Sequence, residues 1–188
     1  MKESKFYRVI RPLVNAFISV FIHPKYIGLS NIPKDGSYVL AGNHISILDP
    51  LLVMSSTKRS IHFLAKDELW KGFKKIIFAN LGLIPVNRRE KDNFALKEAE
   101  KYLFEGKVIG IFPEGTTNKK NELLSFKVGA VKMAYDTNTK IVPFAIKGRY
   151  GFFRKISISF GKPIYVKSNN FKEESVKLRN IITKMKEG

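Results

Sequence analysis

Short apolar runs alternate with amphipathic stretches along most of this chain. Runs rich in Val, Ile and Phe have the length and composition of buried strands, and several are separated by segments in which apolar residues recur every three to four positions. Strands are predicted at 37–42, 60–65, 83–86, 108–112, 141–146, 156–160 and 163–166. This alternation predicts a single α/β domain, with a mixed sheet of about seven strands flanked by helices.

Helices are expected where the apolar positions follow the 3.6-residue period and a capping residue stands at the start. They are predicted at 67–80, at 92–106, from Ser125 onward, and at 174–188. Two prolines constrain the strands, since a proline donates no backbone hydrogen bond to a sheet. The strands that hold Pro85 and Pro143 are therefore expected at a sheet edge or at a bulge.

The N-terminal segment carries four basic residues and then an apolar stretch at 13–22. Ten helical residues rise about 15 Å, half of a hydrocarbon core of about 30 Å, so the stretch is too short to span a membrane. One interpretation is a helix at 1–24 that anchors a domain at 25–188 in the membrane plane. Its membrane-contacting side chains would be Phe17, Ile18, Phe21 and Ile22.

Two other interpretations of this segment stay open. One is a terminal helix packed on the domain. The other is a signal peptide, whose order of basic and then apolar residues is similar. Against a signal peptide, His23, Pro24 and Lys25 stand where a small-residue cleavage site is expected.

Charge and composition narrow the possible partners. Lys and Arg number 34 against 16 Asp and Glu, a formal net charge of +18, which favours anionic partners. The hydrophobic fraction of 44%, with basic residues spread among aromatic ones, favours lipid over nucleic acid, for which no motif is recognisable. The chain has no cysteine, which excludes disulfides, thiolate metal sites and a cysteine nucleophile.

The segment 147–155, "KGRYGFFRK", places aromatic residues among four basic ones between two predicted strands. Aromatic rings at headgroup depth beside cations are typical of a loop at a membrane interface, which would put Phe152 and Phe153 in contact with lipid. The alternative is a hairpin whose phenylalanines fold back into the core.

The stretch "NHISILDP" places His44 and Asp49 five residues apart after a predicted strand. Asp49 followed by Pro50 could simply begin a helix as its N-cap. If the chain turns between the two residues, however, the carboxylate can hold one imidazole nitrogen while the other takes a proton. Because an ordinary imidazole has a pKa of about 6.5, such a pair is a useful general base near neutral pH.

Two further stretches follow predicted strands. "FPEGTT" presents Glu114, a glycine that allows close approach to the backbone, and two hydroxyls. "GLIPVNRRE" ends in Arg88 and Arg89, whose guanidinium forks suit phosphate. Each alone would be read as an ordinary turn or a solvated basic surface. Together with His44 and Asp49 they suggest a single site.

The chain resembles the glycerolipid acyltransferase family in these same residues. "NHISILDP" is similar to the family's NHxxxxD box, "GLIPVNR" to its second block, "FPEGTT" to its FPEG box, and "IVPFAIKG" to its fourth block, all in the expected order. The resemblance runs from about residue 28 to residue 161. Length and a single hydrophobic N-terminal helix look most like the bacterial 1-acyl-sn-glycerol-3-phosphate acyltransferases.

The resemblance implies an O-acyltransferase reaction with residue-specific roles. His44, oriented by Asp49, would deprotonate the sn-2 hydroxyl of a lysophosphatidic acid, which then attacks the thioester of acyl-CoA or acyl carrier protein. Transfer would be direct and would need no metal and no other cofactor. Arg88 would bind the acceptor phosphate, and the expected substrate-binding set is Arg88, Glu114, Gly115, Thr116, Lys119 and Lys127.

One position departs from the family pattern. Thr117 stands where an arginine often follows FPEGT, so a nearby lysine must supply that charge. The acceptor could accordingly be another lysophospholipid or an aminoacyl lipid, and a lipid esterase or thioesterase in which His44 activates water is a further alternative. The expected location is the cytoplasmic face of the cell membrane, as a peripheral or monotopic protein on an anionic surface.

Overall fold

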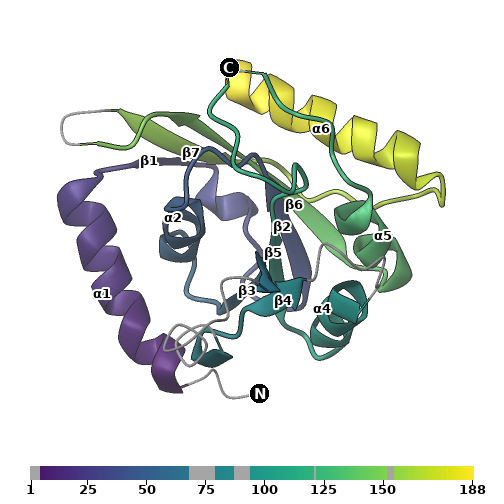
Figure 1. The fold of residues 1–188 in the computed structure, drawn as a ribbon, viewed down its shortest axis with the longest axis horizontal. Helices are drawn as coiled ribbons and strands as arrows, with labels where there is room; N and C mark the ends of the chain where they lie inside the picture. Colours follow the sequence, from purple (N-terminus) through teal and green to yellow (C-terminus); the bar gives the residue numbers. More distant parts are fainter. Residues whose placement is uncertain (1–4, 68–78, 87–93, 121, 152–154) are drawn as a thin grey trace.

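The computed structural model describes residues 5–67, 79–86, 94–120, 122–151 and 155–188. Its centre is a seven-stranded sheet with the order β1-β7-β6-β2-β5-β3-β4 (Figure 1). The strands are β1 (Lys25–Ile27), β2 (Tyr38–Gly42), β3 (Ile61–Lys66), β4 (Ile84–Val86), β5 (Val108–Ile111), β6 (Lys140–Gly148) and β7 (Ile156–Phe160). Five strands run parallel, while β7 and β1 run the other way, so the sheet is mixed, as predicted.

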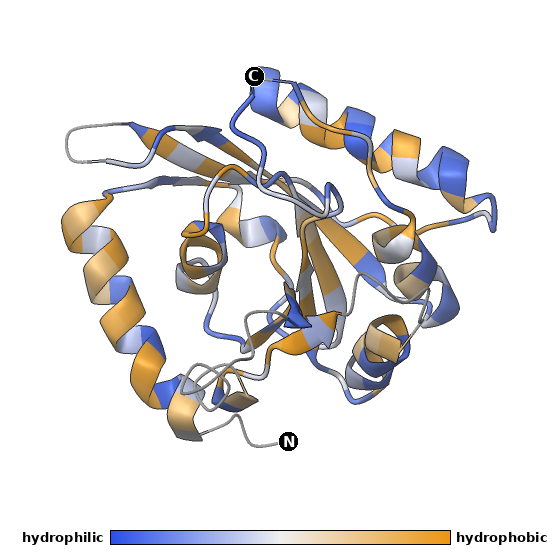
Figure 2. Ribbon diagram, viewed as in Figure 1, coloured by the Kyte–Doolittle hydropathy of each residue, from blue (hydrophilic) through white to orange (hydrophobic). Residues whose placement is uncertain are grey.

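Helices cover both faces of this sheet. One face carries α1 (Lys5–Phe21) and α2 (Asp49–Ser55), and the other carries α4 (Phe94–Phe104), α5 (Gly129–Asp136) and α6 (Phe171–Glu187) (Figure 1). Successive side chains of β2 point to opposite faces of the sheet, so this strand contributes to both hydrophobic cores. Tyr38 and Leu40 pack on the α1 and α2 side, while Val39 and Ala41 pack on the other. All five residues of this strand are buried, as expected for a strand covered on both faces. The strands at the centre of the sheet are largely orange, that is hydrophobic, in Figure 2.

Six of the seven predicted strands are confirmed, and the seventh is wrong. The stretch 163–166 contributes only a single bridge, between Ile164 and Ile141. The remaining strand of the sheet is β1, whose three residues are too few to show a periodic pattern.

Among the helices, the prediction at 92–106 agrees with α4, and that at 174–188 with α6, which begins three residues earlier. The helix expected from Ser125 begins only at Gly129, because the Lys127 N–H donates to Pro113 O and holds this stretch as a loop. Most of the helix predicted at 67–80 lies outside the described residues.

The two strand prolines differ in outcome. Pro85 lies in β4 at the sheet edge, as expected. Pro143 lies in β6, between β7 and β2, so the expectation of an edge or a bulge is wrong for this strand. A backbone N–H is not needed at Pro143, because the neighbour of β6 on this side changes at that residue. Ile164 bridges to Ile141 before it, and β7 pairs only from Phe144 onward.

Candidate functional site

His44 lies two residues beyond the end of β2, at the edge where the parallel strands present their carboxyl ends. Its Nδ1 is 2.8 Å from Asp49 Oδ2. The imidazole stacks on the ring of Phe112, with 4.1 Å between the ring centroids. The His44 side chain keeps 17% of its surface exposed while Asp49 is fully buried. The ring is therefore fixed at Nδ1 and supported on one face.

The Asp49 carboxylate holds the loop that precedes its own helix. Besides His44, its Oδ2 accepts the N–H groups of Ile45 at 2.6 Å and Ser46 at 2.9 Å. Asp49 is the first residue of α2 and Pro50 follows it, but no side chain caps this helix. The carboxylate thus turns back toward His44 and makes a tight loop of residues 44–49.

Tyr150 completes the hydrogen bonds of Asp49, and the sequence alone did not suggest this role. Its hydroxyl donates to Asp49 Oδ1 at 2.7 Å, from the segment between β6 and β7. Burial and the neighbouring Asp49 charge raise the pKa of the Tyr150 hydroxyl, which keeps it protonated as a donor. Tyr150 turns inward from the predicted aromatic loop, whereas Phe152 and Phe153 lie outside the described residues.

Glu114 connects the loop after β5 to the backbone of His44. Its Oε1 accepts the His44 N–H at 3.0 Å, and its Oε2 accepts the Asn118 side-chain amide at 2.9 Å and the Leu124 N–H at 3.1 Å. Only 6% of Glu114 is exposed. In the structure Glu114 positions the loop that carries His44. The expected contact of Glu114 with glycerol stays a prediction.

Asn43, also absent from the residues singled out in the sequence, ties the end of β2 to β6. It is fully buried, its amide donates to Ile146 O at 2.9 Å, and its Oδ1 accepts the Ile146 N–H at 2.7 Å. The preceding Gly42 lies so close to Phe144 that a Cβ there would come within 2.2 Å of the phenylalanine ring. The backbone leading into His44 is therefore anchored on the β6 side.

The remaining predicted substrate-binding residues are placed as follows. Gly115 has a φ of 70°, and a Cβ at this position would lie 2.9 Å from Lys127 Cε, so the lysine side chain runs against the FPEG turn. Thr116 and Lys119 are exposed on the same connection. Arg88 lies outside the described residues.

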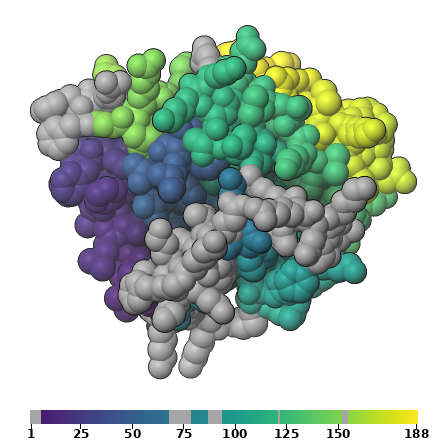
Figure 3. All heavy atoms as spheres, in the orientation of Figure 1, coloured from purple at the N-terminus to yellow at the C-terminus, as the bar shows by residue number. Residues whose placement is uncertain are grey.

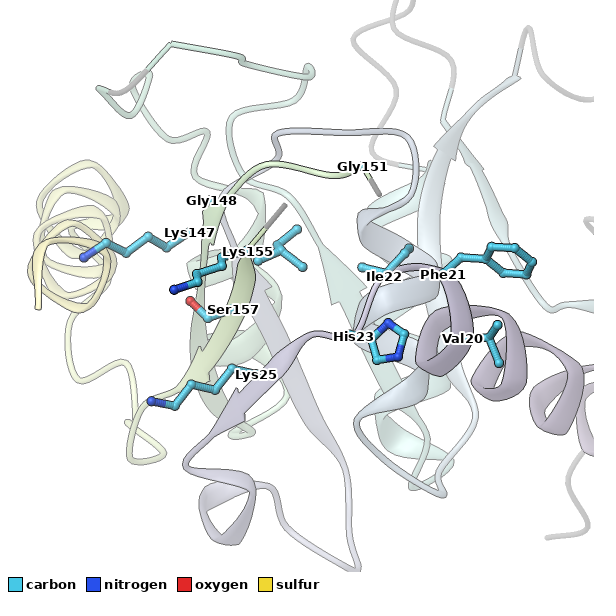
Figure 4. Close-up of a pocket in the computed structure, with 11 residues that line it drawn as sticks. Val20, Phe21, Ile22, His23, Lys25, Lys147, Gly148, Gly151, Lys155 and Ser157 are labelled. Atoms are coloured by element: carbon cyan, nitrogen blue, oxygen red, sulfur yellow. The ribbon is translucent and has the colours of Figure 1, made fainter. Parts of the chain in front are cut away.

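Two cavities border these elements. A cleft of about 1180 Å³ lies between the residues after His44, the end of β6 and the C-terminal half of α6. A second cavity, of about 690 Å³, lies between the end of α1 and the strands β1, β6 and β7 (Figure 4). Within the described ranges, no three His, Asp or Glu side chains are grouped in a way that could hold a metal ion.

The arrangement can perform general base chemistry on a hydroxyl. Because Nδ1 of His44 is held by Asp49, the other imidazole nitrogen is the one available to take a proton, and the buried carboxylate stabilises the resulting charge. The hydrogen bonds from Ile45, Ser46 and Tyr150 fix that carboxylate in turn.

Replacing Tyr150 with phenylalanine should lower kcat about tenfold, because a hydrogen bond to a charged group contributes roughly 1.5–3 kcal/mol and Asp49 would lose one of its fixing contacts. Steady-state kinetics should show the loss in kcat, with little change in either KM. Tyr26→Phe is a matched control, since that hydroxyl bonds Ser55 of α2 and leaves Asp49 untouched. Equal losses in the two variants would contradict a positioning role for Tyr150.

Comparison with known proteins gives consistent matches. The family model described as Acyltransferase matches residues 23–147, a range that contains His44, Asp49 and Glu114. The 1-acyl-sn-glycerol-3-phosphate acyltransferase of Borreliella burgdorferi is 38% identical over 143 residues, which cover 74% of this chain and 57% of that protein. The enzyme of the same name from Bacillus subtilis is 32% identical over 152 residues, covering 75% of this chain and 73% of the relative.

Among solved structures, the chain resembles the 1-acyl-sn-glycerophosphate acyltransferase PlsC of Thermotoga maritima, with a TM-score of 0.77 and 24% identity, over 95% of this chain and 78% of that one. At this identity the likeness establishes the shared fold. The chain spans little more than half the length of the B. burgdorferi protein and of a similarly named Mycoplasma pneumoniae relative, and about three quarters of the B. subtilis enzyme.

Proposed function

Because the chain belongs to the acyltransferase family, we propose that it moves an acyl chain from a thioester to the sn-2 hydroxyl of 1-acyl-glycerol-3-phosphate, giving phosphatidic acid. The acceptor is suggested by the names of the relatives. The observation that carries the proposal is the His44–Asp49 pair, whose partners all come from the loops at the carboxyl edge of the sheet.

In the proposed reaction His44 takes the proton of the acceptor hydroxyl as its oxygen attacks the thioester carbonyl. A carbon–oxygen bond forms, the carbon–sulfur bond breaks, and the proton passes from His44 to the departing thiolate. Asp49 stabilises the imidazolium while the proton is held there. The transfer is direct and forms no acyl-enzyme.

The acceptor phosphate is proposed to meet Arg88 and a lysine at the FPEG turn. Lys127 runs against Gly115 in that turn. It would supply charge where Thr117 replaces the arginine often found in the family, whereas the predicted Lys119 borders the neighbouring cleft instead.

A purified-enzyme assay tests the proposal by crossing acyl-CoA and acyl carrier protein with lysophosphatidic acid and other lysolipids. Phosphatidic acid is the expected product, and transfer to another lysolipid alone would move the assignment to that acceptor. Acyl-CoA incubated without acceptor should be hydrolysed only slowly. Rapid hydrolysis independent of acceptor would instead indicate a thioesterase.

Helix α1 supports association with a membrane, because it has two apolar faces. Its inner face packs Ile18 and Ile22 into the core, so the expectation that these two side chains contact lipid is wrong. The 3.6-residue period separates them from an outer stripe that is between 42% and 65% exposed: Val9, Leu13, Phe17, Val20 and Phe21. Within the described part of the chain, no helix has both the length and the apolar character to cross a bilayer.

The outer stripe lies along one side of the molecule, where α1 is at the surface (Figure 3). Beyond the end of α1, the lysines of the smaller cavity extend away from Val20 and Phe21, toward α6 (Figure 4). Lys147 also donates to Glu187 O of α6, so these lysines belong to the other face of the sheet and not to the stripe. We therefore propose peripheral attachment to the anionic cytoplasmic face of the cell membrane, with the stripe of α1 in the bilayer interface.

A Leu13→Glu/Phe17→Glu double variant should bind anionic vesicles at least about tenfold more weakly, since burying each of these side chains contributes roughly 1.5–3 kcal/mol. Vesicle co-sedimentation measures the change. The control is Tyr165→Glu/Val176→Glu, which adds the same charge at two exposed apolar positions away from α1. Unchanged binding of the α1 variant would overturn the attachment proposal.

A further inference from the structure

The cleft of about 1180 Å³ is built by four separate parts of the chain that meet beside the catalytic loop. They are the residues after His44, the connection after the FPEG turn, the end of β6, and the C-terminal half of α6, which lies along β6 (Figure 1). Crevices outside the carboxyl ends of strands are the usual ligand sites of open α/β sheets.

The lining of this cleft is strongly cationic. Only two carboxylates accompany the six basic side chains, which are Lys119, Lys120, Lys147, Arg149, Arg179 and Lys186. Arg179 holds one wall together, because it donates to the carbonyls of Leu123 at 2.6 Å and Leu124 at 3.0 Å.

By contrast, the side chains of three of these cations have no hydrogen-bond or ion-pair partner among the described residues. Lys119, Lys120 and Arg149 are exposed, and none of their side chains forms an ion pair or a hydrogen bond with another described residue. Like charges that converge without a carboxylate partner repel one another, and a bound polyanion relieves that repulsion. The cleft is therefore suited to a ligand that carries phosphate.

Its position separates this cleft from the expected acceptor phosphate site. The cleft lies on the β6 side of β2, whereas β4, the strand that precedes Arg88 in the sequence, lies on the other side of β2, beyond β5 and β3. Ile45 and Ser46, which directly follow His44, border the cleft, as does Tyr150, which bonds Asp49. A ligand in the cleft would thus approach His44 from the side opposite β4.

The surrounding faces indicate which substrate arrives there. The outer stripe of α1 lies on the α1 and α2 face of the sheet, while α6 covers the other face. A lipid acceptor comes from the membrane, but a thioester donor with phosphate groups comes from water. The α6 side is the one turned toward water if α1 lies in the interface.

We propose that the cleft binds the phosphate of the phosphopantetheine thioester donor, the group that acyl-CoA and acyl carrier protein share. The cations hold the phosphate and the arm places its thioester carbonyl beside His44. This inference rests on the proposed acyl transfer, and it assigns to α6 and the end of β6 a role in donor binding.

A Lys120→Gln/Arg149→Gln double variant tests it. KM for acyl-CoA and for acyl carrier protein should rise about tenfold with kcat within about twofold, since two charge-assisted contacts are lost. KM for lysophosphatidic acid should not change. An acyl-N-acetylcysteamine thioester, which lacks phosphate, should be used equally well by variant and wild type. The control is Lys162→Gln/Lys167→Gln, the same charge change at two exposed residues outside the cleft.

Each outcome is decisive. A raised KM for lysophosphatidic acid with an unchanged donor KM would overturn the inference and make the cleft an acceptor site. Equal effects of the cleft variant and the control would show that only the general surface charge affects donor binding, and would overturn the inference. Failure of the proposed function is recognised separately, because wild-type protein would then transfer no acyl group from any donor.

Discussion

His44→Ala is expected to lower kcat roughly a thousandfold, because the imidazole held by Asp49 is the proposed general base and general base catalysis contributes about 10²–10⁴. The measurement is turnover of lysophosphatidic acid with a saturating thioester donor. Asp49 keeps the donors of Ile45, Ser46 and Tyr150, so the variant should stay folded, and its melting temperature measures the cost of the lost His44 contacts.

Vesicle binding provides the control for this variant. The α1 stripe is exposed on the side of the helix turned away from the core, so membrane association of His44→Ala should equal that of wild type. A kcat within tenfold of wild type would remove His44 as the base, whatever the binding result.

Asp49→Asn should reduce kcat roughly a hundredfold or more while the loop stays formed. An amide oxygen can still accept from His44, Ile45 and Ser46, and the amide nitrogen can face Tyr150, whose hydroxyl can turn to accept. What is lost is the negative charge that stabilises the imidazolium. Steady-state kinetics and thermal unfolding together measure the two effects.

Asp49→Ala is the informative comparison, because it removes the hydrogen bonds as well as the charge. Leaving buried loop donors unpaired costs about 1–3 kcal/mol for each group, so this variant should unfold at a distinctly lower temperature than Asp49→Asn. If both variants lose activity only in proportion to their loss of stability, Asp49 is structural and the catalytic pair is wrong. In the Asp49→Asn background, Tyr150→Phe should cost much less activity than it does in wild type, because the charge that Tyr150 positions is already absent.

Much of the fold could be predicted from the sequence because its signals are local. Buried strands appear in the sequence as apolar runs, which predicted β2, β3 and β5. The helix at 92–106 was predicted from its 3.6-residue period and its terminal glycine. The three-residue strand β1 carries no such signal. It forms because β7 presents an unpaired edge, and that edge exists only once the sheet is assembled.

The contact between His44 and Asp49 was predictable for a similar reason. His44 and Asp49 are five residues apart, and Pro50 favours a helix start at the second of them, so a turn between the two is a local property. Tyr150 is about a hundred residues from Asp49 along the chain, and nothing in its own neighbourhood distinguishes it from the aromatic residues beside it. Its role depends on β6 pairing with β2, which brings the two segments to one edge.

The sequence by itself determined the α/β class, most of the strands, the His44–Asp49 pair and the basic, apolar character that suggests a lipid surface, because each depends on residues close together in the chain. Only the tertiary structure decided which face of α1 is buried, what Asp49 and Glu114 bind, and where the basic residues converge. A helix with two apolar faces cannot choose between them until it meets a partner, and a carboxylate's hydrogen bonds are selected among donors that the folded sheet brings within reach.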